Sequence, residues 1–250
     1  MDGILKKQKI PYICTPLTGK NKEEIMDEID LVLPEKPDML EWRADFLHKL
    51  DDLPYVFSVL EGIAEKSDLP LLFTIRSIHE GGQQISLSEE QKMKLISEVC
   101  KNDAISLVDY EVSSDSANIK ELRRVSQKHG KQLILSYHNF NCTPSEEEIM
   151  KKLFLAEFYG ADIAKAAVMP KTEGDVLRLL QLTNNAGKAL DIPLITMSMG
   201  SLGAISRIIG WSYGSILTFG SGVKESAPGQ IPVRRLRQLI AMLKEDMAAE

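Results

Sequence analysis

Lys165 is the residue whose surroundings most clearly suggest chemistry. It lies in the segment Ala161-Asp-Ile-Ala-Lys-Ala-Ala-Val-Met169, which otherwise has the apolar character of a buried strand. Lysine is seldom fully buried unless another group pairs with it, and desolvation favours its neutral amine. A neutral amine is a nucleophile that forms an imine with a carbonyl compound. Lys165 is therefore a candidate for imine catalysis; the alternative is a structural lysine that reaches water or pairs with an acid.

His138 ends the segment Leu133-Ile-Leu-Ser-Tyr-His138, the apolar run that precedes the one with Lys165. Histidine exchanges protons near neutral pH, which suits a general acid and base beside an imine. The alternative is a hydrogen-bonded core histidine. His138 and Cys142 have loose spacing for metal ligands, and the other three histidines form no pair with ligand spacing. We therefore expect no metal site.

The composition restricts the classes of partner. The 250 residues are 44% hydrophobic and 26% charged, which is typical of a globular protein. The net charge of -6 and the lack of a basic cluster argue against nucleic acid. No apolar run predicts a secretory signal or a membrane span. Three irregularly spaced cysteines indicate reduced thiols, so we expect a cytoplasmic protein.

Strand-like segments alternate with helix-like segments along the chain. The predicted strands are 10–17, 38–45, 70–77, 104–112, 131–140, 161–169, 193–200 and 215–220, and the predicted helices are 21–33, 54–66, 88–102, 116–129, 145–160, 172–190, 202–213 and 232–247. This count and size predict an α/β fold of the (β/α)8 TIM barrel type, with parallel strands. The alternative is a doubly wound open sheet, but the first strand is followed by Thr15-Pro-Leu-Thr-Gly-Lys20, which is no dinucleotide fingerprint. No linker interrupts the chain, so we expect a single catalytic domain over residues 1–250.

Side chains alternate along a strand, so parity predicts which residues share a face. One face of most strands is apolar at its start and ionisable or polar towards its carboxyl end. The groups are Met39, Glu41 and Arg43; Leu72, Thr74 and Arg76; Leu107, Asp109 and Glu111; Ile134, Ser136 and His138; Ile163, Lys165 and Ala167; and Ile195, Met197 and Met199. Barrel active sites lie at the carboxyl ends of the strands, so this face should line the barrel and form the site.

The charged members of these groups also have simpler interpretations. Glu41 with Arg43 could be an ion pair, as could Arg76 with Asp109 and Glu111. Arginine can also hold a substrate carboxylate in bidentate geometry.

Three further features follow the last strands. Arg207 could reach a substrate carboxylate or could be a solvated helix arginine, and Met197 and Met199 should form a wall of the pocket. The segment 221–231, rich in glycine, serine and proline, is expected to be a mobile lid. Its first glycines and Gly81-Gly82 are better explained by backbone geometry than by phosphate binding.

Taken together, these motifs resemble type I 3-dehydroquinate dehydratase, a lyase family of the shikimate pathway, along nearly the whole chain. The motifs are Glu41-Trp-Arg-Ala-Asp45, Phe73-Thr-Ile-Arg-Ser77, Glu80-Gly-Gly82, Asp109-Tyr-Glu111, Ser136-Tyr-His138, Lys165-Ala-Ala-Val-Met-Pro170, Met197-Ser-Met-Gly200, Ser206-Arg207 and Ser226-Ala-Pro-Gly-Gln230. The resemblance implies dehydration of 3-dehydroquinate to 3-dehydroshikimate, the third step of chorismate and aromatic amino acid biosynthesis.

The resemblance also implies roles for individual residues. Lys165 would form an imine with the substrate ketone, His138 would be the general acid and base, and Glu80 would orient the histidine. Asp109 and Glu111 would be supports. The implied substrate-binding residues are Glu41, Arg43, Arg76, Arg207, Ser226, Gln230, Met197, Met199 and Phe219. The family implies no cofactor, no metal and a homodimer, and the short lead before Ile10 suggests an abbreviated N-terminal hairpin beneath the barrel.

Two alternatives remain. A class I aldolase would share the imine-forming lysine, but it would more often carry a phosphate-binding loop and would cleave a carbon–carbon bond. A non-enzymatic barrel could retain the pocket to bind a cyclic hydroxy acid, although intact Lys165 and His138 argue against that alternative.

Overall fold

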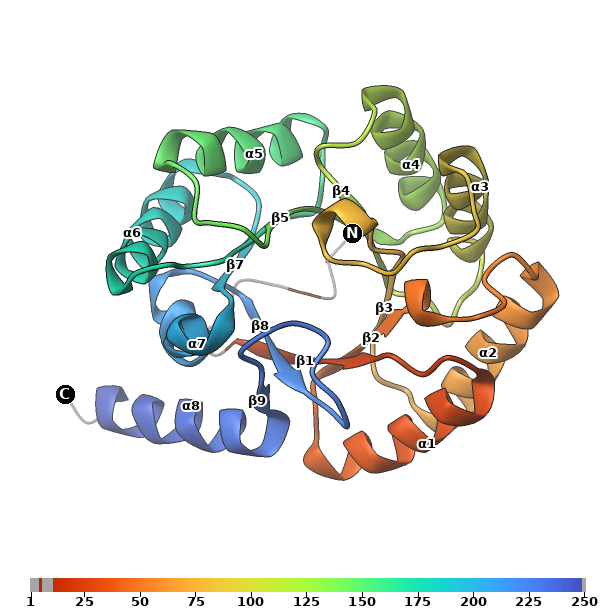
Figure 1. Cartoon of the computed structure of the whole chain (residues 1–250), viewed down its shortest axis with the longest axis horizontal. Coiled ribbons are helices and arrows are strands. Elements are labelled where there is room, and N and C mark those ends of the chain that lie inside the picture. Colours follow the sequence, from red (N-terminus) through yellow and green to blue (C-terminus); the bar gives the residue numbers. More distant parts are fainter. Residues whose placement is uncertain (1–4, 6–10, 249–250) are drawn as a thin grey trace.

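The computed structural model describes residue 5 and residues 11–248, and they form an α/β barrel (Figure 1). Its eight main strands are all parallel: β1 to β7 pair in chain order, and β8 pairs with β1. They are β1 (Tyr12–Leu17), β2 (Met39–Arg43), β3 (Leu71–Thr74), β4 (Leu107–Glu111), β5 (Gln132–Asn139), β6 (Ile163–Val168), β7 (Leu194–Ser198) and β8 (Leu217–Ser221). A two-residue strand, β9 (Ile231–Pro232), pairs with β8. The predicted (β/α)8 barrel is confirmed.

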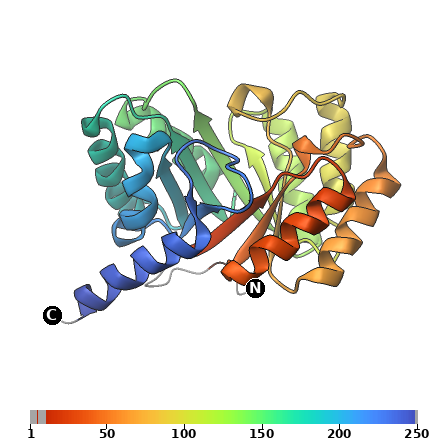
Figure 2. The same ribbon diagram turned by 60° about the horizontal axis from the view of Figure 1, so that its bottom comes forward.

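Helices surround these strands and cover their outer faces (Figure 2). They are α1 (Lys22–Val32), α2 (Leu53–Lys66), α3 (Glu89–Val99), α4 (Ser116–Lys128), α5 (Glu146–Phe158), α6 (Glu173–Ala189), α7 (Gly200–Ile209) and α8 (Val233–Ala248). Short 3-10 turns add η1 (Leu33–Glu35), η2 (Ala44–Phe46), η3 (Ile78–Glu80) and η4 (Gly210–Tyr213). Within the described part of the chain, no helix is long and apolar enough to cross a bilayer.

The predicted element boundaries differ from the structure by only a few residues, and the differences have local causes. Ser88 caps α3 in a full capping box with Gln91, as its sequence predicts. The third strand ends at Thr74 rather than Ser77, because the chain turns there into η3. The predicted helix 202–213 is divided into α7 and η4.

The barrel has two apolar layers, which strand parity separates. Leu40, Trp42 and Phe73 face outward and pack with the inner faces of the helices. Leu72 and Leu107 face inward, in a cluster that also contains Leu5. Leu5 is buried, and its N–H donates to Oε1 of Gln132 at 3.2 Å, so it helps to fill the barrel floor. The expected abbreviated hairpin otherwise lies outside the described residues.

The junction between β7 and β8 is the weakest part of the strand ladder. These strands are not paired over their length; they meet at a single bridge between Leu194 and Ser215. The N–H of Ile216 donates to the Leu194 carbonyl at 3.0 Å, and the N–H of Thr196 donates to Oγ of Ser215 at 3.1 Å. The barrel is therefore closed, but this junction has fewer backbone hydrogen bonds than the others.

Candidate active site

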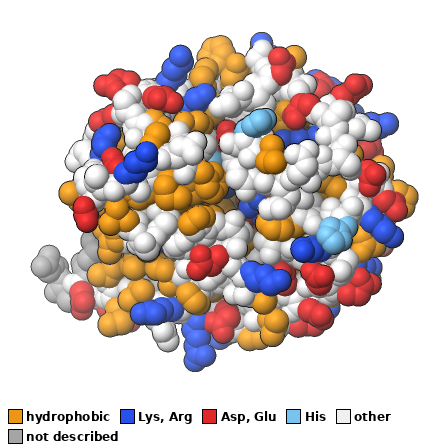
Figure 3. Space-filling model, in the orientation of Figure 1, with side chains coloured by type: hydrophobic (Ala, Val, Ile, Leu, Met, Phe, Trp, Pro, Cys, Tyr) orange, Lys and Arg blue, Asp and Glu red, His pale blue; other side chains and the backbone are white. Residues whose placement is uncertain are grey.

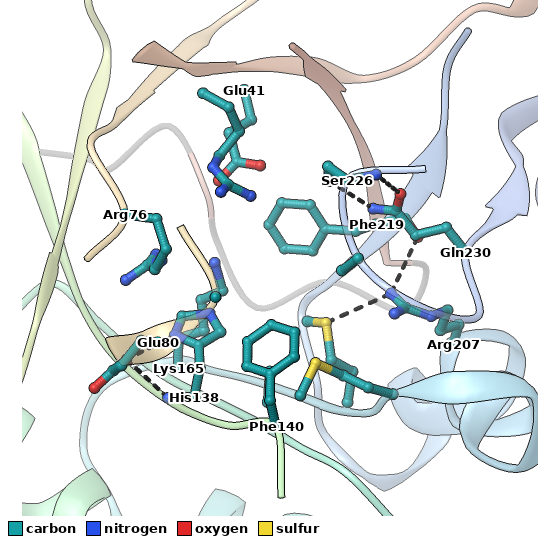
Figure 4. Close-up of a pocket in the computed structure, with 16 residues that line it drawn as sticks. Glu41, Arg76, Glu80, His138, Phe140, Lys165, Arg207, Phe219, Ser226 and Gln230 are labelled. Atoms are coloured by element: carbon teal, nitrogen blue, oxygen red, sulfur yellow. Dashed lines mark hydrogen bonds and ion pairs between the residues drawn. The ribbon is translucent and has the colours of Figure 1, made fainter. Parts of the chain in front are cut away.

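The predicted site residues line one pocket at the carboxyl ends of the strands (Figure 4). These residues are Glu41, Arg43, Arg76, Glu80, His138, Lys165, Met197, Met199, Arg207, Phe219, Ser226 and Gln230. The apolar residues that precede them on each strand form the floor beneath. Parity predicted the placement of the strand residues among them, because each strand contributes its inward residues first to the floor and then to the mouth. Glu80, Arg207, Phe219, Ser226 and Gln230 were expected from the resemblance, and they line the same pocket.

Lys165 is buried, with a relative exposure of 4%, and it also pairs with an acid. Its Nζ donates to Oδ2 of Asp109 at 3.1 Å and lies 4.6 Å from the centre of the Phe219 ring. Asp109 has other, shorter contacts: Nη2 of Arg76 and Oγ of Ser136 each donate to its Oδ1 at 2.6 Å. The carboxylate is therefore shared between Lys165, Arg76 and Ser136.

Arg76 connects three inward groups of the barrel mouth. Its guanidinium donates to Asp109, to Oε1 of Glu111 at 3.0 Å and to Oγ of Ser136 at 2.8 Å. Burial alone would raise the pKa of Asp109 and of Glu111, but the charge of Arg76, with smaller effects from nearby lysines, holds both below their ordinary values. Both carboxylates are therefore ionised at neutral pH. The predicted ion pairing of Arg76 with Asp109 and Glu111 is confirmed.

The suggested ion pair between Glu41 and Arg43 is wrong. Arg43 instead makes a bidentate pair with Asp45, with both N···O distances at 2.8 Å. Asp45 lies in η2, where the chain leaves the strand and turns its carboxylate back towards Arg43. Glu41 accepts a hydrogen bond from Oγ1 of Thr74 at 3.0 Å. Glu41 thus faces the pocket without a paired cation of its own strand.

His138 is oriented by Glu80. Oε2 of Glu80 lies 2.9 Å from Nδ1 of His138 and also accepts from the backbone N–H of the same residue at 2.9 Å. Because Nδ1 is engaged, Nε2 is the ring nitrogen available to the pocket. Burial, and then the charges of Arg76, Lys165 and Arg43, hold the pKa of His138 well below its ordinary value. The imidazole is therefore neutral at pH 7 and ready to accept a proton.

Glu80 is presented by a turn that only glycine allows. A side chain at Gly82 would meet the Arg76 carbonyl oxygen at 1.9 Å, so the two backbone segments touch there. The Gly82 N–H donates to the Ser77 carbonyl at 2.9 Å, which closes the turn around η3. Gly82 therefore has a backbone role, as the sequence favoured. Burial raises the pKa of Glu80 to about 7.

Arg207 is a buried arginine, and no carboxylate of the described residues forms an ion pair with it, although the charge of Glu225 acts on it from a longer distance. Its relative exposure is 1%, so the solvated alternative is wrong. Nη2 donates to the Pro228 carbonyl at 3.1 Å, Nη1 lies 3.4 Å from the Phe219 carbonyl, and Nε has no hydrogen-bond partner. Burial lowers the pKa of Arg207 to about 10, so it remains charged at pH 7. A buried cation with only neutral partners and a free donor is suited to binding an anion.

The loop between β8 and β9, predicted as a lid, covers the pocket on the Arg207 side (Figure 4). Ser226 and Gln230 bind each other through N–H to Oε1 at 2.8 Å and Nε2 to Oγ at 3.2 Å. The Pro228 carbonyl accepts from the N–H of Gly200 at 2.9 Å. Gly229 has φ +76°, and a side chain there would meet the Gly200 carbonyl oxygen at 2.1 Å. Glycine is therefore required for this close contact with the start of α7.

Sequence reasoning missed four lining residues: Gly81, Phe140, Ala167 and Ala227. Phe140 is two residues beyond His138, so extending the parity of that strand by one step would have found it. Ala167 was placed on the inward face but not considered as lining. Ala227 and Gly81 lie in turns, where parity does not apply. In residue 5 and residues 11–248, no group of three or more His, Cys, Asp or Glu is arranged to hold a metal ion.

The raised pKa of Glu80 makes a prediction about stability. Between pH 4.5 and about 7 the unfolded chain loses this proton while the folded protein keeps it, so Glu80 lowers stability as pH rises through that window. The Glu80→Gln variant lacks this pH-dependent loss of stability. Its free energy of unfolding, relative to the parent protein, should therefore rise by up to about 3 kcal/mol from pH 4.5 to pH 7.

Urea unfolding at several pH values measures this difference. Glu90→Gln, which removes the same charge from an exposed position on α3, is the matched control. A Glu80→Gln difference that stays flat or falls with pH would contradict the burial argument.

The chain and its structure are closely similar to known proteins. The profile of the type I 3-dehydroquinase family matches residues 13–247. The 3-dehydroquinate dehydratase of Albidiferax ferrireducens is 46% identical over 240 residues, which is 96% of this chain and 91% of the relative.

Two solved structures are also closely similar. The 3-dehydroquinate dehydratase of Geobacillus kaustophilus has a TM-score of 0.92 at 45% identity and covers 94% of this chain and 91% of its own. The type I enzyme of Clostridium difficile is described with a covalently modified comenic acid. It has a TM-score of 0.92 at 39% identity, and the match covers 96% of this chain and 95% of the Clostridium chain. Because profile, relatives and structures agree over nearly the whole length, this chain belongs to the type I 3-dehydroquinase family.

Proposed function

We propose that this protein dehydrates 3-dehydroquinate to 3-dehydroshikimate through an imine on Lys165. The observation that carries the proposal is one buried pocket with two functional ends. Lys165 and His138 come from adjacent strands, whose pairing places Lys165 opposite Ser136 and His138 opposite Ala167. Arg207, Ser226 and Gln230 lie at the other side of the same pocket (Figure 4). A small cyclic ketone with a carboxylate matches this arrangement of nucleophile, base and cation.

The chemistry follows from these groups. The Lys165 amine adds to the substrate ketone, and loss of water gives an iminium ion. The iminium withdraws electrons and acidifies the neighbouring carbon, from which Nε2 of His138 takes a proton. The resulting enamine expels the substrate hydroxyl group, which leaves as water with the proton from His138. Hydrolysis of the conjugated iminium releases the enone product and the free lysine, so one water is lost overall.

The protonation states of the site suit this sequence. The low pKa of His138 leaves the imidazole neutral and able to act as a base at pH 7. Glu80 fixes the ring through Nδ1 and, with a pKa near 7, can offset the positive charge that appears on the imidazolium. Arg76 and Ser136 also donate to Asp109, so the carboxylate beside Lys165 is not dedicated to the lysine.

The remaining lining residues have roles in binding. Arg207 would bind the substrate carboxylate, beneath the lid residues Ser226 and Gln230. Glu41, Arg43 and Arg76 would position the ring hydroxyls on the opposite side. Met197, Met199 and Phe219 are buried and form apolar walls that exclude water. The loop between β8 and β9 would open for substrate and close over it.

We also propose a cytoplasmic homodimer in which the chain is one catalytic domain. The three cysteines, Cys14, Cys100 and Cys142, are unpaired, as in a reducing compartment. Leu202 and Ile205 on α7 and Met242 on α8 are exposed, and Figure 3 shows apolar side chains gathered over this part of the surface. Such a patch is suited to a second copy of the chain. Light scattering should give about twice the monomer mass of 27.9 kDa, and a monomer at all concentrations would overturn the dimer.

Trapping tests the reaction and the lysine together. Without added metal, the protein should convert 3-dehydroquinate with rising ultraviolet absorbance from the enone. Borohydride added with substrate should reduce the imine and leave a ligand-sized mass on the Lys165 peptide. Lys165→Ala should show neither result, and His138→Ala should lose on the order of 100-fold or more in turnover with product binding largely retained.

The controls separate the parts of this proposal. Lys171→Ala, at an exposed lysine just beyond the same strand, should leave the adduct on Lys165 unchanged. Absence of an enone signal at high protein concentration would end the dehydratase proposal. An adduct on another lysine would overturn the role of Lys165 alone.

Arg207→Gln tests the carboxylate site. Removing a charge-assisted contact worth about 1.5 to 3 kcal/mol should raise KM about 10- to 100-fold, with a smaller effect on kcat. Steady-state kinetics measure the two separately. Arg124→Gln, at an exposed arginine paired with Glu121, is the control and should leave KM unchanged. A lower kcat at the parent KM would assign Arg207 to the chemical step instead.

A further inference from the structure

Lys92 is a buried charge that the proposed reaction does not use. It belongs to α3, has a relative exposure of 3%, and does not line the pocket. Its Nζ donates to Oε2 of Glu111 at 3.1 Å and lies 5.0 Å from the centre of the Tyr110 ring. Glu89, an exposed acid of the same helix, is 4.0 Å away. Because burying an ammonium group costs free energy, a lysine directed inward from a surrounding helix calls for a physical reason.

Lys92 begins a continuous row of alternating charges that ends at Lys165. Glu111 binds Lys92 through Oε2 and Arg76 through Oε1, at 3.1 and 3.0 Å. Asp109 binds Arg76 through Oδ1 and Lys165 through Oδ2, at 2.6 and 3.1 Å. Each carboxylate therefore offers one oxygen to each of two cations. All five side chains are buried, with relative exposures between 2% and 4%.

We propose that Lys92 is a positioning residue for Lys165: it completes this charge row and thereby sets the pH at which Lys165 forms its imine. The inference rests on the proposed function. Lys92 touches neither the pocket nor the reacting atoms, so it acts only through Glu111, Arg76 and Asp109.

The physical reason is that three cations share two carboxylates. With Lys92 present, Glu111 is paired with a cation from α3, and Arg76 remains paired with Asp109. Without Lys92, the row would hold two cations and two anions, and the potential at Lys165 would become more negative. A more negative potential favours the ammonium form of Lys165, which is not nucleophilic. Because the row is buried, water and salt screen this effect only weakly.

Other charged groups face the same end of the row and stay constant in the comparison. Those around the pocket are Cys14 on β1, Glu41 and Arg43 on β2, Glu80 on η3, His138 on β5 and Arg207 on α7. Those around Lys92 are Glu89 on its own helix and Tyr110 and Glu111 on β4. Lys92→Met removes the contacts of the ammonium group with Glu89, Tyr110 and Glu111 and leaves the other groups in place. Glu80, with a pKa of about 7, titrates in every protein compared, so the shift of each variant is read against the parent.

The experiment measures imine formation directly, as a function of pH. Lys92→Met keeps the length of the side chain and removes its charge, and Lys92→Arg keeps the charge. Lys94→Met removes the same charge from an exposed position on the same helix. Each protein is mixed with 3-dehydroquinate, quenched with borohydride after increasing times, and assayed for the adduct on the Lys165 peptide, from about pH 6 to about pH 10.

For Lys92→Met, the midpoint of the pH profile should move up by about half to one unit, with the high-pH rate retained. At pH 7 this is a loss of about 3- to 10-fold in the rate of imine formation. Lys92→Arg and Lys94→Met should keep the parent midpoint. A uniform loss at every pH, or an unshifted midpoint, would show that Lys92 has a structural role only and would overturn the proposal.

Glu111→Gln should shift the midpoint of the pH profile in the opposite direction, and it keeps the test decisive if Lys92→Met does not fold. It removes an anion from the row, so the midpoint should move down. An upward or absent shift in a folded Glu111→Gln protein would overturn the proposal. No adduct on Lys165 of the parent protein would overturn the proposed function itself, which distinguishes that failure from the failure of the charge row.

Discussion

The guanidinium of Arg76 is the contact on which the mouth of the barrel depends. It donates to Asp109 and Glu111 at once, and both acids are buried with almost no contact with water. Two carboxylates this close would repel each other and resist ionisation without a cation between them. With Arg76 in place, both are charged, the segment that follows β3 is tied to β4, and the polar end of the barrel can exclude water. Lys165, Ser136 and Lys92 all take their positions from this pair of acids.

The barrel supports this charged mouth with an apolar floor made from the same strands. Leu72, Leu107 and Ile134 precede Thr74, Asp109 and Ser136 on their inward faces. The hydrophobic contacts hold the strands at fixed spacing, so the polar side chains above them need little local adjustment. Polar groups on rigid strands also keep their geometry when a ligand enters, whereas the lid residues Ser226 and Gln230 come from a loop. The strands thus hold the reactive groups in fixed positions, whereas the loop between β8 and β9 controls access to the pocket.

Strand parity made most of the fold and of the candidate site predictable from sequence. Period-two alternation assigned Glu41, His138 and Lys165 to the inward face, and the structure places each of them there. Strand parity fails where the chain leaves a strand, because the alternation of side chains ends there. Asp45 could not be assigned as the partner of Arg43, because it lies in a 3-10 turn where alternation ends. Lys92 is one of two lysines in a polar helix, and its burial depends on the tertiary position of Glu111, which no local pattern encodes.

The weak ladder between β7 and β8 has a consequence for how ligand and scaffold support each other. Arg207 belongs to the helix that follows β7, and the loop with Ser226 and Gln230 follows β8. An anion held by both would span the junction where the backbone joins the barrel by a single bridge. The bound ligand would then add a reversible cross-link between the two sides of this weakly paired junction. Binding free energy would tighten the scaffold as well as hold the ligand, so occupancy and rigidity of this quarter of the barrel are thermodynamically linked.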